Sequence, residues 1–439
     1  MLPSPPLLFR GARVLVGDDD DATVVDVAVS GSSIVAVGTR FAPTLPTGPD
    51  TRIVDLSGRW LLPGFVQSHI HLVQTLFRGL ADDLQLLDWL RTRIWPLERS
   101  HDEESVYASA RLGITELLLG GTTAALDMAT VHHTDAVFRA AEEVGFRLTA
   151  GKAMMDIPNE AGLSEPTRVS IESAAAIASR WHRRGRLRYA FAPRFVPSCS
   201  ADLLVETARV ARSMGCLIHT HSSENRDEVK LVRSMTGMDN VEWLAHLGLV
   251  GPDVLLAHCI HVSDDEIRVL AETGTRVLHC PSSNLKLGSG VAPIPELIAR
   301  GVHVSLGADG APCNNRLDMF AELRLAALLP KPRLGAETMP AALALRLATQ
   351  NGAEALGIPA GRVVAGALAD LLVLDPDVLW GDGPPDGAVV YALDSRAVSE
   401  VWVGGEQVVA NGKVRGWDIS ETIALARAAL RRVRARAGI

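Results

Sequence analysis

The sequence has few cysteines, no surplus of basic residues and no long uncharged apolar run. Five cysteines in 439 residues are an odd number, and no CxxC pair occurs, so a reducing compartment is expected rather than a disulfide framework. Lys and Arg number 43 against 51 Asp and Glu, a net charge of −8, which gives no basic surface for nucleic-acid phosphates. No uncharged apolar stretch reaches the roughly 18 residues of a membrane span, and the opening residues lack a secretory-signal pattern. We therefore expect a cytoplasmic protein that binds neither nucleic acid nor a membrane.

What the sequence does contain is enough apolar material for a large core. Hydrophobic residues make up 47% of the chain and charged residues 21%. This composition excludes a disordered chain and a small stapled scaffold. The length suits one large enzyme-type domain with a smaller one, or two to three ordinary domains.

The middle of the chain alternates short apolar runs with amphipathic stretches such as 135–146 and 201–215. Apolar strands that alternate with helices predict a parallel sheet buried on both faces. Seven or eight such units over roughly 300 residues favour an α/β fold of the (β/α)8 type, and a doubly wound sheet is the alternative. The apolar runs lie at 122–128, 187–193, 216–221, 254–259, 275–280 and 302–310.

Both ends of the chain have the sequence pattern of short antiparallel strands. β-branched runs occupy 24–29 and 34–37, and 399–414 carries two turn-type pairs, Gly404-Gly405 and Asn411-Gly412. A helix with a basic C-terminal end is predicted over 420–437. We expect residues 1–63 and 362–439 to form one smaller β-sandwich domain, with its C-terminal helix, around a barrel of residues 64–361.

Ionisable side chains stand where several apolar runs end. In a (β/α)8 barrel these carboxyl ends form the active-site face. His69 and His71 are two residues apart, so in an extended segment they point to the same side. One buried histidine can be a satisfied core residue, but four strand ends in succession are hard to explain that way. Similar positions are held by His219 and His221 (followed by Glu224), His258 and Asp309. Neutral imidazoles with a carboxylate make a suitable ligand set for Zn²⁺ or a similar divalent ion.

These motifs resemble the amidohydrolase superfamily in its mononuclear metal-dependent deaminase branch. The likeness covers nearly the whole chain. It is carried by PGFVQSHIHL (63–72), HTHSSE (219–224), LLAHC (255–259), HCPSSNLKLGSGVAP (279–293), LGADGAPCNNRLDMF (306–320) and LADLLVLD (368–375). The resemblance implies one divalent metal ion, Zn²⁺ by default with Fe²⁺ fitting the same ligands. The implied ligands are His69, His71, His221 and Asp309.

The resemblance also implies hydrolytic deamination of an amino-substituted ring. The bound metal lowers the pKa of a water, and Asp309 accepts the proton of that water. Glu224 protonates the ring nitrogen beside the reacting carbon, and His258 orients the attacking oxygen. His219 is expected to support its strand rather than to bind metal.

Within the branch, residues 75–98 resemble the deaminases of S-adenosylhomocysteine, methylthioadenosine and 5′-deoxyadenosine. This likeness implies that Glu98 contacts the ribose hydroxyls and that Trp89 covers the sugar or its 5′ substituent. Without this resemblance, the sequence would predict that Trp89 packs in the core of a helix and that Glu98 is an acidic residue at a helix end.

The segment APRFVPSCS (192–200) instead resembles guanine deaminase, where the arginine meets the polar edge of the purine. Arg194 and Lys152 can bind a keto group, ring nitrogens or a carboxylate, or can be structural ion-pair partners. A guanine- or pterin-type deaminase, or an s-triazine hydrolase, is therefore the alternative enzyme. The resemblance places Asn284 on a loop at the barrel mouth, where ordering the mouth and contacting the substrate are both open roles.

A non-enzymatic relative that assembles or scaffolds is the third possibility. Such relatives typically lose metal ligands, and all four ligand positions are present here. We expect a small-molecule substrate, and the resemblance implies a homo-oligomer.

Overall fold

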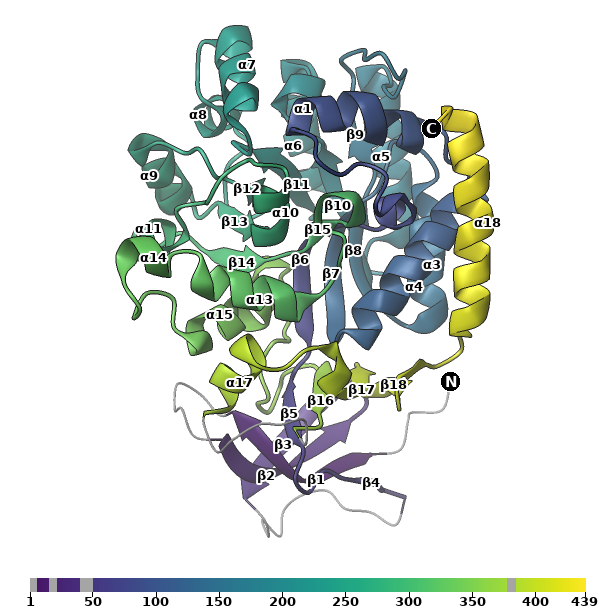
Figure 1. The fold of residues 1–439 in the computed structure, drawn as a ribbon, viewed down its shortest axis with the longest axis vertical. Coiled ribbons are helices and arrows are strands. Elements are labelled where there is room, and N and C mark those ends of the chain that lie inside the picture. The colour runs from purple at the N-terminus through teal and green to yellow at the C-terminus, as the bar shows by residue number, and fades with distance from the viewer. Residues whose placement is uncertain (1–5, 16–21, 40–49, 377–383) are drawn as a thin grey trace.

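The computed structural model describes residues 6–15, 22–39, 50–376 and 384–439, and its centre is a ring of parallel strands. Neighbouring strands pair in chain order, as in a (β/α)8 barrel (Figure 1). The strands are β6 (Phe65–His71), β7 (Thr122–Met128), β8 (Arg147–Gly151), β10 (Leu187–Pro193), β11 (Leu217–Ser222), β12 (Val254–His258), β13 (Arg276–His279) and β14 (Val304–Leu306), with the short β9 (Ala153–Met154) beside β10.

One segment closes this ring. β14 pairs with β13, and three residues later β15 (Asp309–Gly310) pairs with β6, the first strand. Gly307 lies in the short link between them, and a Cβ at this position would come within 2.6 Å of the backbone N and O of His69. Glycine therefore permits the close approach of the last strand to the first.

The helices that follow the strands cover the outside of the ring (Figure 1). The larger ones are α3 (Glu103–Leu119), α4 (Thr134–Val144), α5 (Thr167–Trp181), α6 (Ala201–Ser213), α7 (Arg226–Thr236), α8 (Asn240–His246), α9 (Asp264–Thr273), α13 (Met319–Leu328), α15 (Ala341–Ala348) and α18 (Ile419–Ala437). Shorter ones are η1 (Leu72–Phe77), α1 (Leu86–Trp89), η2 (Leu90–Ile94), α2 (Trp95–Arg99), η3 (Val196–Ser198), α10 (Pro281–Lys286), α11 (Ile294–Ala299), α12 (Ala311–Asn314), α14 (Lys331–Leu334), α16 (Gln350–Ala355), α17 (Pro385–Tyr391) and η4 (Ser395–Ala397). Helix α18 packs along α3, so the chain returns to the barrel at its end.

The second sheet combines both ends of the chain. Its nine strands are β1 (Leu7–Leu15), β2 (Ala22–Ser30), β3 (Ser33–Thr39), β4 (Arg52–Asp55), β5 (Trp60–Pro63), β16 (Leu371–Leu374), β17 (Val398–Val403), β18 (Glu406–Ala410) and β19 (Lys413–Val414). β5 and β16 pair antiparallel and so join the N-terminal part to the C-terminal part. The predicted fold, a barrel with a smaller β-domain from both chain ends, is confirmed; the residue boundaries of the domains stay a prediction.

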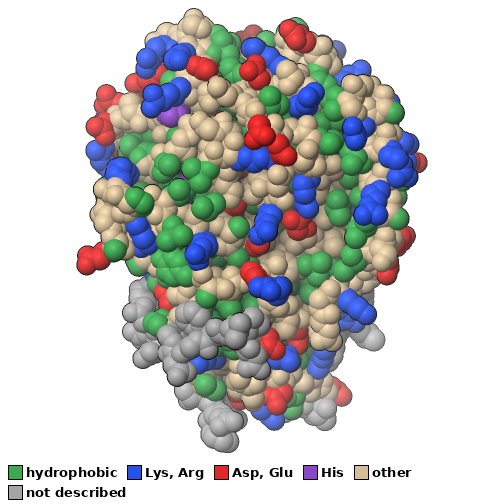
Figure 2. Space-filling view, viewed as in Figure 1, with side chains coloured by type: hydrophobic (Ala, Val, Ile, Leu, Met, Phe, Trp, Pro, Cys, Tyr) green, Lys and Arg blue, Asp and Glu red, His purple; other side chains and the backbone are tan. Residues whose placement is uncertain are grey.

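Other observations agree with the composition. All five cysteines are buried and free. Among the described residues no helix is both long and apolar enough to cross a membrane. On the face seen in Figure 2, basic and acidic side chains are interspersed rather than gathered by sign.

Candidate active site

The histidine pair of β6 faces the aspartate of β15 across the closing strand pair. His69 and His71 are buried, and the Nε2 atom of each lies 3.3 Å from Asp309 Oδ1. Because Asp309 pairs in register with Ile70, between the two histidines, the parallel strands themselves set this geometry.

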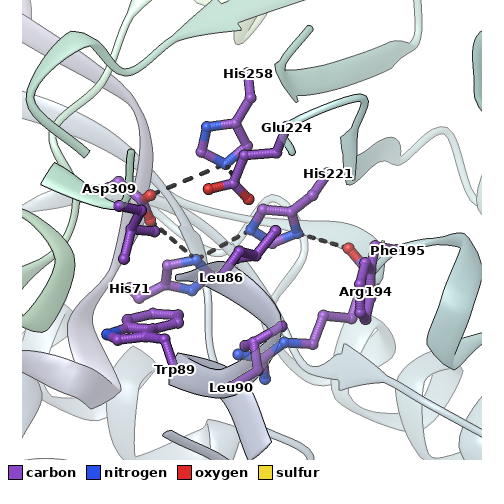
Figure 3. A pocket seen from close by; sticks show the side chains of 11 residues that line it. His71, Leu86, Trp89, Leu90, Arg194, Phe195, His221, Glu224, His258 and Asp309 are labelled. Atoms are coloured by element: carbon purple, nitrogen blue, oxygen red, sulfur yellow. Dashed lines mark hydrogen bonds and ion pairs between the residues drawn. The ribbon is translucent and has the colours of Figure 1, made fainter. Parts of the chain in front are cut away.

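The ends of β11 and β12 add two more imidazoles at the same point. His221 Nε2 lies 3.2 Å from His71 Nε2 (Figure 3). His258 Nε2 lies 3.9 Å from Asp309 Oδ2 and 3.4 Å from Glu224 Oε2.

The ligand atoms form two overlapping groups, each with all its atoms within 4.8 Å of one another. The first contains His69, His71 and Asp309, and the second contains His69, His221 and His258.

The second nitrogen of each ring is held by the protein. His71 Nδ1 donates to the carbonyl of Met128 at 2.8 Å, and His221 Nδ1 donates to the carbonyl of Arg194 at 2.6 Å. His69 Nδ1 lies 2.7 Å from His219 Nε2. Where Nδ1 carries the proton, Nε2 keeps its lone pair, which is the arrangement of a metal-ligating histidine.

One unsatisfied atom supports the fit of these residues to a metal ion. The Nε2 atom of His69 is buried and makes no hydrogen bond to any described residue. A buried polar atom without a partner is costly, and a divalent ion would satisfy it. Imidazole nitrogens with one carboxylate suit Zn²⁺ or Fe²⁺. The candidate site for one divalent ion is therefore formed by four side chains, those of His69, His71, His221 and Asp309.

Burial and neighbouring groups together shift the pKa values of the side chains in this site. Burial, with the adjacent imidazole of His69, lowers the pKa of His71 to about 4, so its ring is neutral near pH 7. Burial alone would raise the pKa of Asp309, but the His69 and His71 imidazoles hold it well below its usual range. Burial and the nearby carboxylates of Asp309 and Glu228 raise the pKa of Glu224 well above its usual value. The pKa values of these two neighbouring carboxyl groups are therefore shifted in opposite directions.

A cavity of about 370 Å³ opens beside these groups. Its lining combines His71, His221, Glu224, His258 and Asp309 with the apolar side chains Leu86, Trp89, Leu90, Phe195 and Leu287 and with Arg194. The apolar cover comes mostly from α1 and η2, which lie across the barrel mouth. Concave sites with an apolar lining and a few converging polar groups bind small molecules.

The four predicted substrate-binding residues are placed differently. Trp89 and Arg194 line the cavity, whereas Glu98 is 2% exposed and is bound to Arg194 by a two-point ion pair. Lys152 is not among the cavity-lining residues. Its ammonium forms an ion pair with Glu165 and donates to Ser173 Oγ at 2.7 Å.

Several residues that touch the site groups had no assigned role in the sequence prediction. Ser283 Oγ donates to Asp309 Oδ2 at 2.6 Å, and Asn284 Oδ1 lies 2.9 Å from His258 Nδ1. Both stand on α10, directly after β13, and this position after a strand end is the signal that could have found them. Gln74 and Thr130, which bind Glu98, follow β6 and β7 in the same way.

Comparisons with known proteins identify the family of the chain. The model of the amidohydrolase family matches residues 60–408. The chain is 40% identical to a 5′-deoxyadenosine deaminase of Methanothermobacter thermautotrophicus, over 88% of this chain and 90% of that protein. It is 37% identical to a 5-methylthioadenosine/S-adenosylhomocysteine deaminase of Moorella thermoacetica, over 92% and 96% respectively. A crystal structure of an adenosine deaminase from Xanthomonas campestris with bound zinc has a TM-score of 0.90 at 30% identity, with 98% of each chain covered.

The fold, the family match and the deaminase-named relatives together define a hydrolase that acts on C–N bonds, with histidines and an aspartate gathered at the mouth of its barrel. The chain belongs to the amidohydrolase family.

Proposed function

We propose that this protein hydrolytically deaminates the purine ring of a 5′-modified adenosine, with 5′-deoxyadenosine, methylthioadenosine and S-adenosylhomocysteine as the candidate substrates. The observation that carries the proposal is the convergence of two carboxyl groups, Asp309 and Glu224, and several imidazoles on one cavity. The names of the relatives at 37% and 40% identity support the choice of substrate.

The reaction replaces an exocyclic amine by oxygen: water adds to the ring carbon, a C–O bond forms, the C–N bond breaks and ammonia leaves. His69, His71, His221 and Asp309 would hold one divalent ion, Zn²⁺ by preference. When bound, this ion supplies a water whose pKa is lowered toward neutrality.

The side chains of the site move the protons and orient the reactants. Asp309, held as a carboxylate, accepts the proton of the attacking water. Glu224 has one buried oxygen without a partner among the described residues, so it can donate its proton to the ring nitrogen and then pass a proton to the leaving amine. His258 stands between these carboxyl groups, where its Nε2 atom can orient the attacking oxygen.

For Lys152, the contacts with Glu165 and Ser173 support the structural ion-pair alternative. Trp89 remains the candidate that covers the sugar, since its ring borders the cavity beside His71 (Figure 3).

The test is ammonia release from a side-by-side panel by the zinc- or iron-loaded enzyme. We expect turnover of the three 5′-modified adenosines and much slower turnover of guanine, pterin and an s-triazine. Preferred turnover of guanine or pterin would overturn the substrate assignment. Absence of ammonia from every member would overturn the deaminase assignment.

A further inference from the structure

Glu98 has no hydrogen-bonding capacity left for a sugar. Its Oε1 atom accepts from Gln74 Nε2 at 2.8 Å and from Arg194 Nη2 at 3.1 Å. Its Oε2 atom accepts from Thr130 Oγ1 at 3.0 Å and from Arg194 Nη1 at 2.8 Å. An ionised carboxylate offers about four lone-pair sites, and all are engaged. A vicinal diol would have to donate two more hydrogen bonds to this buried group.

Arg194, in contrast, keeps hydrogen-bond donors that no described residue uses. A guanidinium carries five N–H donors. Among the described residues its side chain donates only to Glu98, in a two-point pair, so about three donors remain. The guanidinium borders the cavity beside Leu90, on the side away from His258 (Figure 3). The polar group that this wall offers to a ligand is therefore a donor and not an acceptor.

We infer that Arg194 is the group that binds the substrate's hydrogen-bond acceptors, and that Glu98 is a positioning residue that acts through Arg194. This inference rests on the proposed function and deepens it. A two-point pair fixes the plane of the guanidinium before a ligand enters, which lowers the entropic cost of binding. Because Glu98 balances the charge of Arg194, the wall selects a neutral acceptor that does not belong to the diol, such as the ring oxygen of the sugar or a ring nitrogen of the base, over an anion.

A substrate pair with and without the diol tests the assignment. The kinetic constants of Glu98→Gln are compared with those of the unaltered enzyme on 5′-deoxyadenosine and on its 2′,3′-dideoxy analogue. If Glu98 acts through Arg194, both substrates lose kcat/KM by the same factor, at least about tenfold, with most of the loss in KM. If Glu98 binds the diol, the loss is confined to the diol-bearing substrate, and the inference is overturned.

Two further variants keep the result interpretable. Thr130→Val removes one donor from Glu98 but leaves the two-point pair, so we expect a much smaller rise in KM. Arg194→Lys keeps the charge but loses the fork, and we expect it to reproduce the loss of Glu98→Gln, with the double variant no worse than the more severe single one. Additive losses in the double variant would contradict the assignment. If Glu98→Gln fails to fold, judged by its thermal transition, Arg194→Lys is assayed on the same substrate pair, and an equal loss on both is again the supporting result.

Failure of the proposed function gives a different pattern. If the unaltered enzyme deaminates guanine rather than adenosines, the same variants are assayed on guanine, which has no sugar. A loss in Glu98→Gln on guanine still supports the positioning role, and an unchanged KM on guanine overturns it.

Discussion

At the barrel mouth, each imidazole is oriented by whatever its second nitrogen meets. His69 differs from His71 and His221, because its partner is another side chain, His219, rather than a backbone carbonyl. Partners of this kind fix the ring and raise its basicity, and their loss typically costs 10–100-fold in metal affinity.

We therefore expect His219→Ala to bind Zn²⁺ about 10–100-fold more weakly than the unaltered protein. His219→Gln should recover part of the affinity, since its side-chain oxygen can accept from His69 Nδ1. Titration against a competing chelator measures both. Unchanged affinity in His219→Ala would show that this ring only fills its strand.

Variants of Glu224 and Asp309 should distinguish a loss of catalysis from a loss of metal binding. Glu224→Gln is expected to lower kcat by about 10²–10⁴-fold while its metal content stays normal, because it removes a proton donor that is not among the proposed ligands. Asp309→Asn should lose turnover and bind metal more weakly. Elemental analysis measures the metal content, and steady-state kinetics measure kcat. Near-normal kcat in either variant would refute the assigned roles.

The histidines and Asp309 were predictable because each ends an apolar run, where a charged or polar group stands out. The partners of these residues were not. Met128 and Arg194 hold imidazoles through backbone carbonyls, which leave no side-chain signature in the sequence. Glu98 and Arg194 are 96 positions apart, and nothing local in the sequence pairs them.

At the scale of elements, the two turn pairs of the C-terminal strands were predicted and are confirmed. Gly404-Gly405 and Asn411-Gly412 join β17 to β18 and β18 to β19, and all four residues have positive φ, as tight hairpin turns require. The division of the last barrel strand into β14 and β15 was not predictable, because the run 302–310 looks continuous. Its two parts form through pairing with different neighbours, β13 and β6.

Gly307 is expected to be intolerant of any side chain. Gly307→Ala would press a methyl group against the backbone of His69, and we expect it to lower the free energy of unfolding by about 1–3 kcal/mol and to reduce metal content. Gly387→Ala is the matched control, since a Cβ there meets nothing within 4 Å. Denaturant titration measures the difference. Equal stability of the two variants would contradict the close approach.

Glu322 of α13 joins two short helices of the barrel mouth. It accepts from the Ser282 backbone N–H of α10 at 3.1 Å and from Asn314 Nδ2 of α12 at 2.8 Å. Burial raises the pKa of Glu322 to about 7. Since the folded state then holds a proton that the unfolded state has released, this group's contribution to stability falls as pH rises from about 4.5 to 7.

The free energy of unfolding of the unaltered protein, minus that of Glu322→Gln, should accordingly decrease by up to about 3 kcal/mol over this pH window and stay constant above it. Denaturant unfolding at several pH values measures the difference. Glu272→Gln, at an exposed position of α9, serves as control for the substitution itself. A difference for Glu322 that rises with pH would mean that the buried carboxyl is ionised throughout.

At the scale of the whole molecule, the stability of the fold should depend on the metal, because the proposed metal-binding side chains come from strands that are far apart in the chain. An ion that binds only the folded state at 100 times its Kd adds about 3 kcal/mol of stability. We expect a chelator to lower the Tm and equimolar Zn²⁺ or Fe²⁺ to restore it, with a smaller change in Asp309→Asn. Calorimetry with and without chelator measures the effect. A Tm indifferent to chelation would argue against a resident ion.

The residue that completes the ligand set also sits on the segment that completes the ring. A metal ion bound by Asp309 therefore also holds the junction between the first and last strands of the barrel. We expect metal binding to slow deuterium uptake by the backbone amides of residues 304–310. This measurement needs neither turnover nor a known substrate.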